Sequence, residues 1–120
     1  MSESIRLVSE PLSLFELQKL AEDGFGDFVK AVVDVDQRVM VVGGELHADE
    51  EQYLLERGSQ QGNLWGINLY PAQFGTDEWV EFDSMINLRP SAGNRSRGVE
   101  NPATKNLIVE IVNELVRSDG

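Results

Sequence analysis

The sequence contains no cysteine and no long apolar run. The absence of cysteine excludes disulfide bonds, thiolate metal sites and thiol nucleophiles, and it is consistent with a reducing compartment. A membrane-spanning helix needs about 18 or more apolar residues in succession, and a signal peptide needs a shorter apolar run near the N-terminus. Because neither pattern is found, we expect a soluble, cytoplasmic protein that has no membrane partner.

Basic residues are also scarce. Ten lysines and arginines stand against 21 aspartates and glutamates, which gives a formal net charge of −11. Nonspecific affinity for nucleic acid or anionic lipid comes largely from the neutralisation of phosphates by lysine and arginine. This acidic balance therefore argues against nucleic acid as a partner.

The chain length and the order of helix and strand patterns predict one α+β domain over residues 1–120, with residues 1–10 either flexible or forming an extra edge segment. The predicted order is helix, hairpin, helix, hairpin, helix. About four mostly antiparallel strands are expected, with three helices packed on one face of the sheet. The stretches that carry these elements are residues 13–24, 28–44, 47–59, 63–71, 78–90 and 101–116.

Two helix starts are well marked. Ser13 followed by Glu16 is a capping box, and Asn101 followed by Pro102 is typical of an N-cap and a first helical position. In the first strand, Lys30 and Asp34 lie on the face opposite Val29, Ala31 and Val33, so we expect that face to be half exposed.

One stretch breaks the acidic pattern: "RPSAGNRSRGVENP", residues 89–102, leaves the last predicted strand and leads to the last helix. Glycines, arginine guanidinium groups and the N-terminus of a helix are the components of an anion-binding loop. The alternative is that Arg95 and Arg97 pair with the protein's own carboxylates. The ligand-binding interpretation assigns six residues: Arg89, Asn94, Arg95, Ser96, Arg97 and Asn101.

Catalytic candidates are few. His47 is the only histidine and lies among acidic residues at the start of a helix, and Asp83 shares a strand face with Glu81. Either side chain can act as a general base, but the acids near His47 are also expected for helix-dipole reasons, and those near Asp83 fit a solvated strand edge. We expect no metal site and no cofactor.

A second polar cluster, "GSQQGNLWGINLYP", contains Gln60, Trp65 and Asn68, which can contact a small polar ligand. The alternative for Trp65 is packing. Asn68 and Asn87 are unusual in mid-strand, and we expect them to hydrogen-bond the long loop.

The stretches "ADEEQYLLERGSQQGNLWGINLYP" and "EWVEFDSMINLRPSAGNRSRGVENP" resemble a small, functionally uncharacterised bacterial family, largely cyanobacterial, that is known as a domain of unknown function. The resemblance covers roughly the C-terminal two-thirds of the chain. It implies a bacterial cytosolic protein and transfers no activity and no site residue. The arginine-containing loop lies within one of the sequence motifs that distinguish this family.

Two functions are consistent with the sequence. The first is a small cytoplasmic homodimeric binding protein that takes a small anionic ligand or a protein partner through residues 89–101. The second is a hydrolase or transferase that acts on a phosphorylated small molecule, with His47 or Asp83 as the base.

Overall fold

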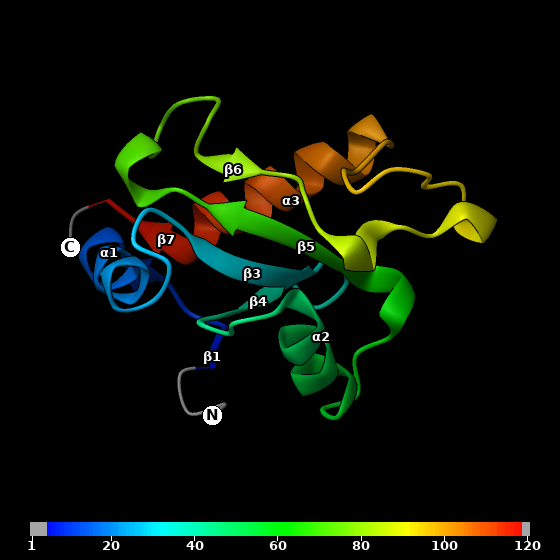
Figure 1. Ribbon diagram of the computed structural model, residues 1–120, viewed down its shortest axis with the longest axis horizontal. Helices are drawn as coiled ribbons and strands as arrows, with labels where there is room; N and C mark the ends of the chain where they lie inside the picture. The colour runs from blue at the N-terminus through cyan, green and yellow to red at the C-terminus, as the bar shows by residue number, and fades with distance from the viewer. Residues whose placement is uncertain (1–4, 119–120) are drawn as a thin grey trace.

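The computed structural model describes residues 5–118 (Figure 1). Three α-helices and two sheets make up the fold. The helices and strands in chain order are β1 (Arg6–Val8), β2 (Leu12–Ser13), α1 (Leu14–Asp23), β3 (Val29–Asp34), β4 (Val39–Val42), α2 (His47–Leu55), β5 (Leu64–Leu69), β6 (Val80–Glu81), α3 (Pro102–Leu115) and β7 (Val116–Arg117).

The main sheet has five strands in the order β1-β4-β3-β5-β6, and all neighbours are antiparallel. A second, two-stranded parallel sheet joins β2 to β7. The predicted α+β class, with three helices on a mostly antiparallel sheet in a single domain, is confirmed. The predicted count of about four strands is too low: β1 is a fifth strand at the edge of the main sheet, formed by residues 6–8, and β2 and β7 make the second sheet. Residues 1–4 lie outside the described part of the chain.

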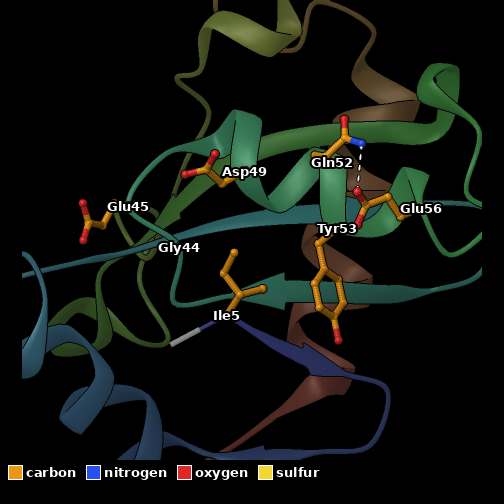
Figure 2. A pocket seen from close by; sticks show the side chains of 7 residues that line it. All are labelled: Ile5, Gly44, Glu45, Asp49, Gln52, Tyr53 and Glu56. Carbon is orange, nitrogen blue, oxygen red and sulfur yellow. Dashed lines mark hydrogen bonds between the residues drawn. The ribbon is translucent and has the colours of Figure 1, made fainter. Parts of the chain in front are cut away.

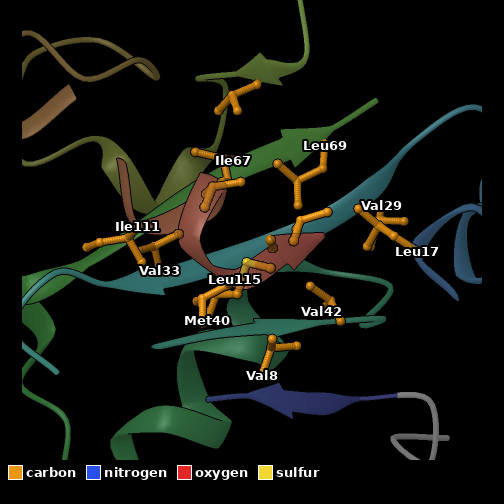
Figure 3. Close-up of a cluster of buried hydrophobic side chains, with 14 of the residues drawn as sticks. Val8, Leu17, Val29, Val33, Met40, Val42, Ile67, Leu69, Ile111 and Leu115 are labelled. Atoms are coloured by element: carbon orange, nitrogen blue, oxygen red, sulfur yellow. The ribbon is translucent and has the colours of Figure 1, made fainter. Parts of the chain in front are cut away.

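The expectation that all three helices pack on one face is wrong. In Figure 1, α3 runs behind the main sheet and α2 lies in front of it. The larger core cluster joins α1 and α3 to one face of β3, β4 and β5 (Figure 3). A smaller cluster of Val32, Val41, Leu54 and Leu64 packs α2 on the other face. Since Val32 and Val41 make that face apolar as well, it needs a cover of its own.

The face of β3 expected to be half exposed is therefore largely covered. Asp34 is fully buried, and its carboxylate accepts hydrogen bonds from the backbone N–H groups of Asp36 and Gln37 and from Ser59 Oγ. These bonds satisfy the oxygen atoms of a buried side chain and close the turn between β3 and β4.

The helix starts are confirmed. Ser13 Oγ accepts from the backbone N–H of Glu16 at 3.1 Å. Asn101 Oδ1 accepts from the backbone N–H groups of Ala103 and Thr104, and Pro102 is the first residue of α3. Local sequence chemistry alone determines both starts.

The strand predicted within residues 78–90 is much shorter than expected. Only Val80 and Glu81 pair with β5, and the chain then leaves the sheet. Side chains replace the missing strand. Asn87 Oδ1 accepts from the backbone N–H of Gly66 at 2.9 Å, and Asn87 Nδ2 donates to the Gly66 carbonyl at 3.0 Å. Arg89 donates to the carbonyl of Leu64 further along the same edge.

We predict that Asn87→Ala lowers the free energy of unfolding by about 2–4 kcal/mol, because it leaves two buried backbone groups of β5 without partners. Urea unfolding measures this change. The control is Asn106→Ala on the exposed surface of α3, which we expect to change stability by less than about 0.5 kcal/mol. Equal effects of the two substitutions would show that the amide of Asn87 does not complete the sheet.

Candidate functional site

A pocket of about 270 Å³ opens between the start of α2 and the chain that follows β6. We name it the α2 pocket. Phe28, Leu46, Ala48, Met85 and Ile86 form its less polar part. Its polar lining consists of Lys30, His47, Asn68, Asp83, Ser84 and Arg97.

Two lining residues of the α2 pocket, Lys30 and Asn68, belong to a row of side chains across the sheet. Lys30 on β3 is the register partner of Asn68 on β5, and Asn68 is the partner of Glu81 on β6. Asn68 Nδ2 donates to Glu81 Oε1 at 2.8 Å, whereas Asn68 Oδ1 is buried and has no hydrogen-bond partner. Asn68 is only 7% exposed. A ligand or water that donates to Oδ1 would satisfy this buried acceptor.

His47 is the first residue of α2 and is buried against β5. Its Nε2 lies 2.8 Å from the carbonyl oxygen of Ile67. Because a carbonyl only accepts, Nε2 carries the proton and Nδ1 keeps its lone pair. Burial is the largest cause that lowers the pKa of His47, and the charges of Lys30 and Arg97 act in the same direction. The imidazole is therefore neutral at pH 7 and is a competent base.

Gly66 makes room for this arrangement. A Cβ atom at Gly66 would lie 2.5 Å from Ser84 Oγ and 3.2 Å from His47 Cδ2. Any larger residue would push Ser84 and the imidazole away from β5. The glycine in mid-strand thus has a packing role at the back of the pocket.

The start of α2 faces the same pocket. Leu46 is the N-cap residue and makes no side-chain capping bond, and Leu46, His47 and Ala48 all line the pocket. The backbone N–H groups in the first turn of a helix carry partial positive charge and bind anions. Asp49 in the first turn offsets part of this charge, whereas burial raises the pKa of Glu50 well above its usual value and so weakens the contribution of this second acid.

Arg97 connects the predicted arginine loop to the pocket. Its Nε donates to Asp83 Oδ1 at 2.6 Å, in an ion pair at the pocket wall. The self-pairing interpretation is therefore confirmed for Arg97. The same bond brings three predicted residues, His47, Asp83 and Arg97, into one pocket. Arg95 is exposed outside the lining, and its backbone N–H donates to Glu100.

Other predicted ligand contacts are occupied inside the protein. Asn94 Nδ2 donates to the carbonyls of Asn87, Ser96 and Gly98, and its Oδ1 accepts from the backbone N–H of Glu100. The hydroxyl of Ser96 accepts from the backbone N–H of Gly98. These bonds make residues 94–100 a folded support for Arg97. Asn101, described above, caps α3.

Arg89 and Trp65 form a second supporting contact. The guanidinium of Arg89 lies 4.5 Å from the centre of the Trp65 ring and donates to the carbonyls of Leu64 and Ile86. Trp65 also packs against the main core, as the packing alternative predicted. Gln60 is exposed next to the short turn Gln61–Asn63. None of the three lines the α2 pocket.

The two mid-strand asparagines differ in role. Asn87 contacts the loop through Arg97 O, as expected, but Asn68 bonds Glu81 and lines the pocket. Sequence reasoning did not assign Lys30 or Ser84. The alternation of β3 puts Lys30 opposite the core face, but only the β3–β5 register shows that it lies beside Asn68.

A separate hollow of about 350 Å³ lies on the outer side of α2. Figure 2 shows Glu45 and Asp49 toward one end and Glu56, which accepts from Gln52 Nε2, at the other. Within residues 5–118, no group of three or more histidines, aspartates or glutamates is placed to hold a metal ion. The carboxylates of Glu45, Asp49 and Glu56 repel anions, so this hollow does not suit an anionic ligand.

Sequence comparison places the chain in a family. The family model described as "Protein of unknown function (DUF5674)" matches residues 6–115, so the chain belongs to this family. No curated protein and no solved structure matches the chain. In the described part of the chain, no helix has the length and apolar character needed to span a membrane.

Proposed function

We propose that this member of the DUF5674 family binds a small phosphate-bearing molecule in the α2 pocket. The observation that supports this most is the meeting of Lys30, Arg97 and the uncapped start of α2 around one hollow. The cytoplasmic location, the homodimer and a protein partner stay predictions from the sequence.

Charge favours this pocket over other sites on the chain. The protein carries a net charge of −11, yet the pocket lining has two cationic side chains against one carboxylate. Arg97 uses Nε to bind Asp83, and a guanidinium has four further N–H donors. Phosphate oxygens accept well from such donors, from an ammonium group and from helix N–H groups.

The hydrogen-bond acceptors in the α2 pocket limit which anions can bind there. Asn68 Oδ1 has no partner, and Asp83, whose Oδ1 already accepts from Arg97 Nε, lines the same pocket. The unpartnered acceptor of Asn68 favours a ligand that carries a hydrogen-bond donor as well as negative charge. Near pH 6, close to its second pKa, a phosphate monoester carries an O–H group, whereas sulfate carries none. The pocket chemistry therefore favours phosphate over sulfate.

We predict that inorganic phosphate at pH 6 binds the wild-type protein more tightly than sulfate does. Lys30→Ala and Arg97→Ala should each weaken phosphate binding by about tenfold or more, because each removes a charged donor. Isothermal titration calorimetry measures the affinities.

Arg95→Ala is the matched control, since Arg95 lies in the same loop but outside the pocket lining. We expect it to leave phosphate affinity unchanged. If Arg95→Ala lowered the phosphate affinity as much as Arg97→Ala does, the anion would bind on the loop and not in the pocket. The absence of phosphate binding to the wild type would contradict the proposal.

Catalysis is the second candidate function, and the hydrogen bond from His47 Nε2 to Ile67 O favours it. This bond fixes the imidazole and leaves Nδ1 to accept a proton. In hydrolysis, the water oxygen forms a bond to phosphorus and gives one proton to Nδ1, while the bond between phosphorus and the ester oxygen breaks. The leaving oxygen then takes a proton from the imidazolium or from solvent, which returns His47 to its neutral form. Asp83 is the less suitable base, because its Oδ1 already accepts from Arg97 Nε at 2.6 Å.

For this second function, we expect slow hydrolysis of p-nitrophenyl phosphate, followed by its absorbance. His47→Gln should lower the rate by about 10²-fold or more, whereas Asp83→Asn should have a smaller effect. Equal rates for the wild type and His47→Gln would remove His47 as the base. A wild-type protein that binds phosphate but does not hydrolyse the ester would be a binding protein only.

A further inference from the structure

An apolar hollow of about 570 Å³ adjoins the α2 pocket. We name it the aromatic hollow, because Phe25 and Phe28 line it together with Leu20 and Val29. The two hollows share three lining residues: Phe28, Lys30 and Leu46. They are therefore neighbouring hollows that meet at these three side chains.

We propose that the two hollows together bind one ligand, a phosphate monoester with an apolar body. The phosphate lies in the α2 pocket and the apolar body lies in the aromatic hollow. This proposal rests on the proposed function and adds the substrate class.

Lys30 stands where the two parts of such a ligand meet. Its side chain lines both hollows, and its Nζ lies 5.3 Å from the centre of the Phe25 ring. The ammonium group lies on the side of the aromatic hollow, and the flexible side chain can turn it toward a phosphate in the adjoining α2 pocket while the carbon chain stays along the apolar part.

The wall of the aromatic hollow is supported by ring stacking. Phe25 and Phe28 stack with centres 4.8 Å apart, and Phe28 also contacts the ring of Tyr70 at 5.4 Å. Yet Phe25 remains 46% exposed and Leu46 remains 56% exposed. An apolar ligand body would cover this surface, and burial of apolar area favours binding. Hollows of this size are typical of small-molecule sites.

Acidic side chains limit what the apolar part can carry. Asp23 and Glu45 line the aromatic hollow, so a second anionic group at that end would be repelled. The ligand therefore has one anionic end and a neutral body. This excludes molecules with a phosphate or carboxylate at both ends.

Calorimetric titration at pH 6 with inorganic phosphate, phenyl phosphate and phenol tests this proposal. We expect phenyl phosphate to bind about tenfold more tightly than inorganic phosphate, and phenol to bind at least about tenfold more weakly than phenyl phosphate. Phe25→Ala should remove most of the affinity difference between phenyl phosphate and inorganic phosphate, measured on the same variant.

Phe15→Ala is the matched control. Phe15 is also an exposed phenylalanine with a lysine over its ring, since Lys19 Nζ lies 5.9 Å from the ring centre, but it lies on α1 outside the aromatic hollow. We expect Phe15→Ala to keep the full difference in affinity between phenyl phosphate and inorganic phosphate. Melting temperatures without ligand show that both variants fold.

The wild-type titrations alone separate the two proposals. Equal affinities for inorganic phosphate and phenyl phosphate would overturn the apolar part and leave the phosphate site intact. If neither inorganic phosphate nor phenyl phosphate binds, both proposals are overturned. Phenol that binds as tightly as phenyl phosphate would show that the hollow does not depend on the anion, and would also overturn the single-ligand proposal.

Discussion

The side-chain amide of Asn87 takes the place of a strand at the open edge of β5, and the shape of the pocket depends on this contact. It pairs with both backbone groups of Gly66 at 2.9 and 3.0 Å and also donates to the carbonyl of Arg97. The backbone N–H of Ser84 donates to the same carbonyl. One amide thus holds together the strand edge, the chain after β6 and the arginine loop, and these elements form a wall of the α2 pocket.

This constraint changes the role of the arginine loop. Asn94 and Arg89 bond to backbone carbonyls and do not line the α2 pocket, so they support it from outside. Arg97 alone of the loop's predicted binding residues lines the pocket. The partners that complete the site come from elsewhere in the chain: Lys30 from β3 and His47 from α2. A basic-looking loop in an acidic protein therefore acts mainly as a scaffold.

Sequence chemistry was sufficient where a few neighbouring residues decide the structure. The Ser13 and Asn101 caps and the α+β class were predicted and confirmed. The early end of β6 was not, because alternation in residues 80–88 is typical of a strand, whereas Asn87 and Arg89 compete for the same edge with their side chains. The shared pocket of His47, Asp83 and Arg97 depends on register across β3, β5 and β6, which no local pattern encodes. The second covered face follows from Val32 and Val41, which resemble ordinary strand residues in the sequence.

The central claim is that an anion binds at the start of α2 and not at the start of α3. A ¹H–¹⁵N correlation spectrum of the ¹⁵N-labelled protein, recorded during titration with inorganic phosphate, tests it most directly. Our account predicts that the largest shifts occur at the backbone amides of His47, Ala48 and Arg97, with little change at Ala103 in the first turn of α3. Shifts confined to Arg95 and Ala103, or no shifts at all, would contradict it.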